Sequence, residues 1–135
     1  MKKITSIKSI CDQYDYFLFD QWGVLHNGLN TFEDSKNCLK NLKSMGKKNI
    51  LVSNSSKLTK YSIQNLRNLG IDDDLYDYTI TSGQIAFDSF SKDIFKKYGD
   101  KCYPISLSKE KVKMFNLKTV QKLKNANFSL IADIA

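Results

Sequence analysis

The chain has 135 residues, of which 41% are hydrophobic and 26% are charged, as in a globular domain with a core of its own. No apolar run approaches the roughly 20 residues of a membrane span, and the N-terminus lacks the continuous apolar stretch of a secretory signal. The formal net charge is +7, but the lysines are scattered and Arg67 is the only arginine, so the charge does not favour nucleic-acid binding.

The three cysteines, Cys11, Cys38 and Cys102, lie far apart and form neither a CxxC motif nor a cluster with histidine. This spacing suggests neither a zinc site nor a disulfide framework. We therefore expect a protein of the reducing cytoplasm that has no membrane partner.

Three predicted strands alternate with helices in the first hundred residues. The run 16–19 is continuously apolar, and 49–52 is apolar after Asn49, which is typical of strands buried on both faces of a parallel sheet. Residues 78–81 are the third predicted strand. Alternation of strands and helices at this spacing predicts right-handed crossovers and a parallel α/β sheet.

Apolar residues at three- and four-residue spacing mark the predicted helices. Thr31 is expected to cap the helix after the first strand, with Asp34 completing a capping box. The helices are expected at 6–12 (capped by Thr5 or Ser6), 31–45, 61–69 and 82–98, the last three ending at glycines.

The sequence after residue 100 has weaker signals. Residues 101–105 are a candidate strand, which Pro104 would place at a sheet edge, and 108–125 are expected to form one or two helices. Residues 128–132 read as a buried strand close to the last residue, Ala135. Such a strand leaves an edge exposed, so we expect either an incomplete polypeptide or another chain that covers the edge.

Asp20 directly follows the first apolar strand. In open α/β sheets, ligands bind beyond the carboxyl ends of the strands, so this carboxylate is a candidate catalytic group. An aspartate in this position also forms turns through its own side chain, and position alone leaves both interpretations open.

Small polar side chains follow the second strand at 53–56, before a helix. Hydroxyl and amide groups beside a helix N-terminus suit an anion such as phosphate, and an ordinary cap or turn is the alternative. His26, the only histidine, is either a base or a residue that fixes the loop. The acidic run 72–74 is expected to be a solvated loop rather than a metal site.

Three segments together resemble one protein family. Residues 20–28, Asp-Gln-Trp-Gly-Val-Leu-His-Asn-Gly, are similar to the first motif of class IIA hydrolases of the haloacid dehalogenase (HAD) superfamily. Residues 52–56 match the second motif, and Thr-Ser-Gly at 81–83 follows the third strand as in that class. The resemblance implies a Rossmann-like core, with helices on both faces of a parallel sheet, whose N-terminal part is residues 1–100. The incomplete beginning of a class II cap would follow at 101–135.

The resemblance also implies a phosphatase site. Asp20 would be the nucleophile that forms an aspartyl-phosphate, and Mg²⁺ would be held by Asp20 and the backbone carbonyl of Trp22. Ser53, Asn54 and the backbone at Gly23 would bind the phosphoryl oxygens.

Two departures from the family pattern limit this expectation. Trp22 stands where the phosphatases carry a second aspartate as general acid and base, and superfamily dehalogenases carry an aromatic residue there. The third-motif lysine and the acidic metal-binding pair would follow the cap, and neither Lys57 nor Lys60 is assigned to the missing lysine.

The sequence thus predicts a magnesium-dependent hydrolase of a small phosphate ester, with the 135 residues alone inactive. The alternative is a degenerate, non-catalytic module that binds phosphate or a partner, and a basic nucleic-acid binder is a third, weaker option. The expected partners are the substrate and, at the sheet edge, a second copy or a missing C-terminal half.

Overall fold

A computed structural model describes residue 4 and residues 6–131. The chain forms two compact units, Met1–Thr81 and Ser82–Ala135. The sequence predicted a different kind of division, between a catalytic core at 1–100 and a cap at 101–135. The assignment of residues 101–135 to a cap stays a prediction. No helix in the described part of the chain is long and apolar enough to cross a membrane.

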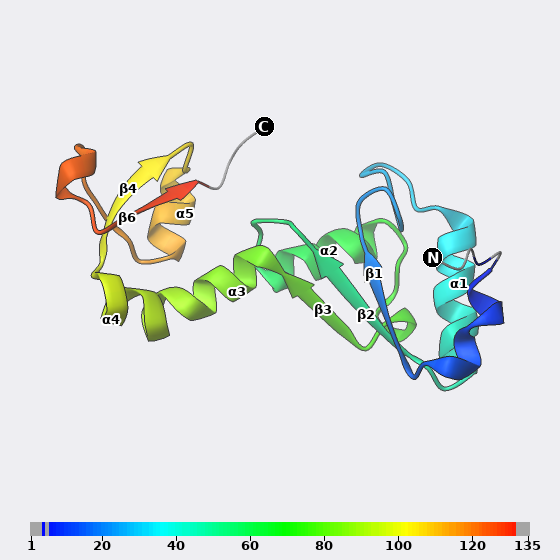
Figure 1. The fold of residues 1–135 in the computed structure, drawn as a ribbon. Coiled ribbons are helices and arrows are strands. Elements are labelled where there is room, and N and C mark those ends of the chain that lie inside the picture. The colour runs from blue at the N-terminus through cyan, green and yellow to red at the C-terminus, as the bar shows by residue number, and fades with distance from the viewer. Residues whose placement is uncertain (1–3, 5, 132–135) are drawn as a thin grey trace. The chain divides into compact units, whose positions relative to one another are not determined.

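The first unit is built on a parallel three-stranded sheet of order β1-β2-β3 (Figure 1). Its strands are β1 (Tyr16–Asp20), β2 (Lys48–Ser53) and β3 (Tyr78–Thr81). Helix α1 (Glu33–Ser44) connects the first two strands, and α2 (Thr59–Asn68) connects the next two. The predicted parallel α/β arrangement is confirmed.

Two predicted helix starts are wrong. Residues 6–12 form no α-helix but two short 3₁₀ helices, Ile7–Ser9 and Cys11–Gln13, and Ser6 makes no capping hydrogen bond through its side chain. Thr31 does not cap α1, because its hydroxyl donates to the carbonyl of Leu69 at 2.6 Å. A third 3₁₀ helix, Asp73–Leu75, precedes β3.

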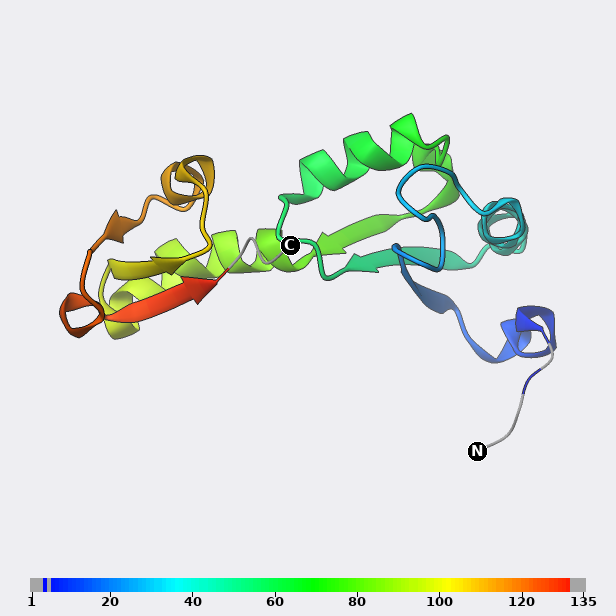
Figure 2. The same cartoon turned by 90° about the horizontal axis from the view of Figure 1, so that it is seen from above.

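The core of the first unit lies on one face of the sheet. Phe19 and Leu51 pack there with Leu39 of α1 and Leu66 of α2, and Figure 2 shows α2 lying along β2 and β3. On the opposite face, Leu18 is 67% exposed, and Tyr16 and Tyr78 are exposed as well. Burial of both faces, predicted for the first strand, is therefore wrong in the described chain, where both helices contribute to a single core.

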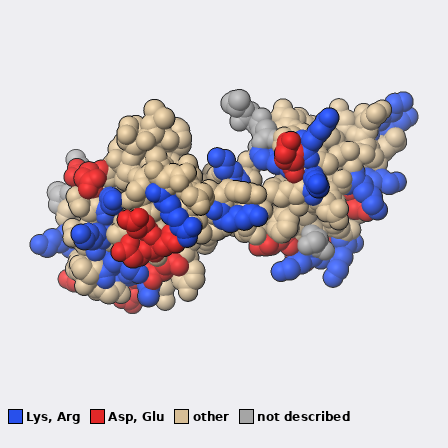
Figure 3. Space-filling view, turned by 180° about the vertical axis from the view of Figure 1, so that it is seen from behind, with Lys and Arg blue, Asp and Glu red and all other residues tan. Residues whose placement is uncertain are grey.

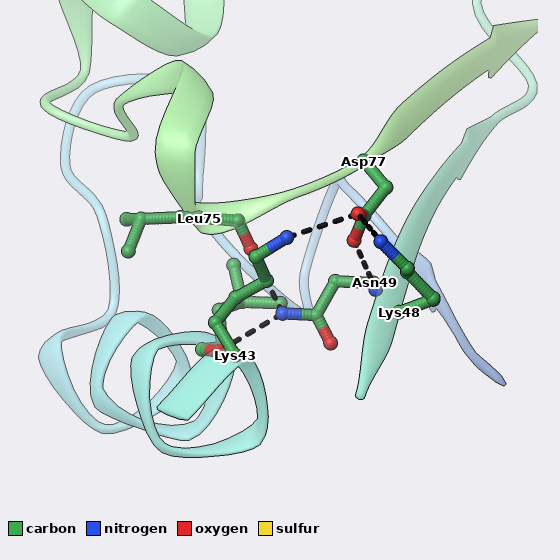
Figure 4. A network of polar contacts seen from close by, with 6 residues as sticks. Lys43, Lys48, Asn49, Leu75 and Asp77 are labelled. Atoms are coloured by element: carbon green, nitrogen blue, oxygen red, sulfur yellow. Dashed lines mark hydrogen bonds and ion pairs between the residues drawn. The ribbon is translucent and has the colours of Figure 1, made fainter. Parts of the chain in front are cut away.

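A buried polar network anchors the start of β2 (Figure 4). The Asn49 side chain is fully buried, and its Nδ2 donates to the carbonyls of Leu39 and Leu75 at 2.9 and 2.8 Å. Asn49 N–H donates to Asp77 Oδ2 at 3.0 Å, and Lys43 and Lys48 each contact Asp77 Oδ1 at 2.9 Å. This network ties α1, β2 and the segment before β3 together.

The second unit has its own parallel sheet, of order β5-β4-β6. Its core contains Phe90, Cys102, Phe115 and Leu117. Its elements are α3 (Ser82–Ser89), a π-helical turn (Phe90–Ile94), α4 (Phe95–Tyr98), β4 (Lys101–Ile105), α5 (Lys109–Met114), β5 (Lys118–Thr119), a 3₁₀ helix (Leu123–Asn125) and β6 (Phe128–Ile131).

The edge position predicted from Pro104 is wrong, because β4 lies between two strands. The proline is tolerated because β5 pairs only with Lys101 and Cys102, so Pro104 lies where β4 is paired with β6 alone. Residue 132, the end of the last predicted strand, lies outside the described residues.

The one-sided core predicts unequal costs for two leucine substitutions. Leu51→Ala removes a fully buried side chain and should lower the free energy of unfolding by about 2–5 kcal/mol. Leu18→Ala, on the exposed face, should change it by about 0.5 kcal/mol. Urea unfolding followed by circular dichroism measures both, and equal losses would contradict the assignment of the core to one face.

The Asp77 network predicts an acid-sensitive contribution to stability. Burial raises the pKa of Asp77, but hydrogen bonds from Lys48, Lys43 and the N–H of Asn49 outweigh it and hold the pKa at about 2. The unfolded chain, with a carboxyl pKa of about 3.9, binds more protons between these values, so this stabilisation is present above pH 4 and is lost as the pH falls to 2.

Asp77→Asn should therefore be less stable than wild type at pH 5, and the difference should shrink as the pH falls from about 4 to about 2. Asp72→Asn, at an exposed position nearby, serves as the control and should follow the wild type. Thermal unfolding across this pH range measures the effect. A difference that stays constant down to pH 2 would show that Asp77 does not act through its charge.

Candidate functional site

The register of the first sheet brings the two predicted functional strand ends together. Asp20 ends β1 opposite Val52 of β2, and Ser53, the next residue, ends β2 opposite Thr81. Both side chains therefore stand at the carboxyl edge of one sheet, and both line a cavity of about 500 Å³. Trp22 and Asn54, also predicted site residues, line the same cavity.

The loop after Asp20 is fixed by its own backbone. The Asp20 carboxylate accepts from the N–H of Gln21 at 2.8 Å, and the Gln21 carbonyl accepts from the N–H of Leu25 at 2.9 Å. The N–H of Gly23 donates to the carbonyl of His26 at 2.8 Å, and Gly23 is not among the residues that line the cavity. The structure therefore does not bring Gly23 together with the other site residues, and its predicted role stays untested.

The polar segment after β2 forms turns, not a helix cap. Ser53 Oγ accepts from the N–H of Ser55 at 3.2 Å, and Ser55 Oγ accepts from the N–H of Lys57 at 3.2 Å. The cap position of α2 is Leu58, whose side chain caps nothing. All three of the bonded residues line the same cavity as Asp20.

His26 is a buried member of the loop. Its side chain is 4% exposed, and Nδ1 accepts from the N–H of Gly28 at 3.1 Å. Burial lowers the pKa of His26, although the charge of Asp20 opposes this. A neutral imidazole that accepts a backbone hydrogen bond favours the loop-fixing interpretation over the role of a base.

Trp22 presents an aromatic ring at the cavity. The side chain is 68% exposed, and its ring meets that of His26 edge to face, with centroids 5.9 Å apart. Gly28 has a φ of +91°, and a Cβ built there would collide with the indole. The glycine is therefore required both by the backbone and by the ring packed against it.

Three further residues at the cavity carried no individual signal in the sequence. Gln21 is only 5% exposed, and Ser62 Oγ on α2 donates to its Oε1 at 2.9 Å. Asn65, one helical turn further along α2, also lines the cavity. The pairing joins residues 41 positions apart, so no local spacing could reveal it.

The remaining predicted motifs have structural contacts. Thr81 is fully buried, and its hydroxyl donates to the carbonyl of Lys57 at 2.8 Å, which supports the turn beside Ser53. In the acidic run, Asp73 pairs with Arg67 and accepts a hydrogen bond from Tyr76. Lysines are spread over the face shown in Figure 3 and are not gathered into one patch.

The donor set of the cavity limits how a metal ion is held. No three His, Cys, Asp or Glu side chains cluster within metal-binding reach among residue 4 and residues 6–131. The Asp20 carboxylate and the Trp22 carbonyl are hard oxygen donors, the type that Mg²⁺ prefers. Mg²⁺ commonly keeps several waters and takes only one or two carboxylates, so these donors fit a weakly held ion that also contacts phosphate.

A comparison with protein families identifies the chain. The family model described as haloacid dehalogenase-like hydrolase matches residues 17–128, most of the sequence. The chain therefore belongs to the haloacid dehalogenase-like hydrolase family. No curated protein matches it significantly.

Solved structures share its fold. A haloacid dehalogenase-like hydrolase from Brucella suis 1330 matches with a TM-score of 0.76 and 23% identity, over 95% of this chain and 48% of that one. A 4-nitrophenylphosphatase from Thermotoga maritima matches with 0.60 and 21%, over 90% and 46%. A p-nitrophenyl phosphatase from Archaeoglobus fulgidus matches with 0.54 and 21%, over 84% and 42%. The chain thus spans about half the length of these proteins.

Proposed function

We propose that this chain carries the nucleophile and the phosphoryl-binding part of a magnesium-dependent phosphatase that acts on small phosphate esters. One observation carries the proposal: Asp20 and Ser53, from neighbouring parallel strands, line the same cavity. The family, and the two phosphatases that share the fold, support phosphate esters as the substrate class.

In the proposed reaction, a carboxylate oxygen of Asp20 attacks phosphorus and the ester oxygen leaves. The Ser53 hydroxyl donates to a phosphoryl oxygen, the Asn54 amide contacts another, and the Lys57 ammonium attracts the anion. Water then hydrolyses the aspartyl-phosphate. Mg²⁺ bound at the Asp20 carboxylate and the Trp22 carbonyl would reduce the repulsion between the two anions.

The proposed site lacks an evident group that could donate a proton to the leaving oxygen. The Trp22 indole cannot give a proton to the leaving oxygen, and His26 is buried with Nδ1 already accepting a hydrogen bond. Asp20 is also the single carboxylate among the described residues that line the cavity. We therefore propose that these 135 residues alone turn over slowly, and that full activity requires groups supplied by a further polypeptide segment.

The same observation supports a second candidate, a non-catalytic phosphate-binding module. Trp22 occupies the place of the general acid, while the residues proposed to bind an anion, Ser53, Asn54 and Lys57, line the cavity. This candidate and the phosphatase differ in one chemical event, the transfer of a phosphoryl group to Asp20.

Asp20→Asn should abolish phosphoryl transfer to the chain. With acetyl phosphate and Mg²⁺, the wild-type chain should gain one phosphoryl group, which intact-mass spectrometry detects and peptide mapping locates at Asp20. Asp88→Asn, an exposed carboxylate in α3, is the matched control and should react as wild type. Phosphate binding without any transfer would favour the non-catalytic module.

Trp22→Asp should restore a proton donor to the site. A positioned acid contributes about 10²–10⁴ in rate, mainly for esters with poor leaving groups. The ratio of glycerol 2-phosphate to 4-nitrophenyl phosphate hydrolysis should therefore rise at least tenfold. Trp22→Asn removes the same ring without adding an acid, and should leave the ratio unchanged. A similar rise in both variants would mean that the ring only blocks access.

A further inference from the structure

The side chain of Gln21 is buried but only half satisfied. Its Oε1 accepts from Ser62, whereas its Nε2 has no hydrogen-bond partner among the residues that the structure describes. Buried amide nitrogens without a partner are rare in native proteins, and each one calls for an explanation. A residue that lines the cavity beside Asp20 can find its missing partner on a ligand.

The Gln21 amide has little freedom to turn away. Its backbone N–H donates to Asp20 and its carbonyl accepts from Leu25 and His26, so the backbone is held on both sides of the residue. Ser62, itself 5% exposed, holds the far end of the side chain from α2. The Nε2 donor is therefore preorganised.

The Gln21 amide is held from a different element of the fold than the groups predicted to bind the phosphoryl oxygens. Ser53, Asn54 and Ser55 come from the end of β2, whereas the partner of Gln21 comes from α2, as does Asn65. An amide side chain such as that of Asn65 offers both donors and an acceptor. This combination suits a hydroxyl group better than a phosphoryl group, which only accepts.

We propose that Gln21 is a specificity-determining residue, whose Nε2 donates to a hydroxyl or carbonyl oxygen on the carbon skeleton of the phosphate ester. The proposal rests on the proposed function, because Asp20 and Ser53 must hold the phosphoryl group for the skeleton to reach Gln21. The proposed substrate class is therefore a phosphate monoester whose carbon skeleton carries a hydroxyl or carbonyl group.

Two probes separate the phosphoryl contact from the skeleton contact. Inorganic phosphate and glycerol 3-phosphate are titrated, with Mg²⁺, into the ¹⁵N-labelled chain. Glycerol 3-phosphate should shift the side-chain amide signal of Gln21 as well as the backbone signals of Ser53 and Asn54. Inorganic phosphate should shift only the backbone signals. The side-chain amide signal of Gln21 is assigned by through-bond correlation to its own backbone signals in the wild-type chain labelled with ¹³C and ¹⁵N.

Gln21→Leu keeps a similar volume and should weaken glycerol 3-phosphate about tenfold while changing phosphate affinity less than about twofold. Gln64→Leu, at an exposed position on α2 whose amide contacts Asn68, is the control and should change neither. Equal weakening of both probes, or no weakening of either, would overturn the inference.

The two proposals fail in different ways. Backbone signals of Ser53 and Asn54 that respond to neither probe would overturn the proposed function and this inference with it. If glycerol 3-phosphate shifts the backbone signals of Ser53 and Asn54 in the wild type but does not shift the side-chain amide signal of Gln21, only the inference is overturned. This last measurement uses the unmodified chain, so it holds even if Gln21→Leu fails to fold.

Discussion

The geometry of the first unit depends on a buried asparagine at the opposite end of the sheet from the cavity. The Asn49 side chain donates to a carbonyl of α1 and to a carbonyl of the 3₁₀ helix before β3. Its backbone N–H donates to the Asp77 carboxylate, and its carbonyl accepts from the N–H of Asp77. These contacts fix the register of β2 relative to β1 and β3. A register slip by one residue would turn every side chain of the strand to the other face. Ser53 stands beside the end of β1 because the anchor at Asn49 holds the strand in place.

At the functional edge, rigidity comes from short-range contacts in the loop after β1. His26 is buried against Trp22, and its Nδ1 accepts a hydrogen bond from the N–H of Gly28. The carbonyl of Gln21 accepts hydrogen bonds from backbone N–H groups later in the loop. The loop is thereby closed on itself. Two long-range side-chain hydrogen bonds attach it to the region of α2: Ser62 donates to Gln21, and Thr31 donates to the carbonyl of Leu69. Asp20 is thus presented by a loop whose shape owes little to the ligand, which is the condition for preorganised binding.

The sequence was sufficient for those features that follow from local patterns. The strands at 78–81 and 101–105 have their predicted bounds, and the meeting of Asp20 and Ser53 follows from parallel pairing of consecutive strands. Burial could not be predicted in the same way. Leu18 lies in an apolar run, yet its exposure depends on what covers the sheet, which no pattern within the strand encodes.

Other differences arise from competition between partners distant in sequence. Thr31 has the spacing of a helix cap, but the carbonyl of Leu69 takes its hydroxyl. Pro104 suggested an edge, but the two-residue strand β5 that flanks β4 gives almost no sequence signal. Gln21 and Ser62 are ordinary polar residues until the fold places them together. Sequence reasoning therefore located the cavity through Asp20 and Ser53, and missed the Gln21–Ser62 pair that lines it, because that pair depends on tertiary contact.

The cavity is lined by residues from two different strands, and this also couples ligand binding to folding. Asp20 and Ser53 belong to strands separated along the chain by α1, so an anion that contacts both recognises only the paired strands. By mass action, such a ligand at a hundred times its dissociation constant adds about 2.7 kcal/mol to the native state. A high cellular concentration of such a ligand would then reduce the unfolded fraction of the protein and slow its proteolysis. A low concentration would leave the protein more easily degraded.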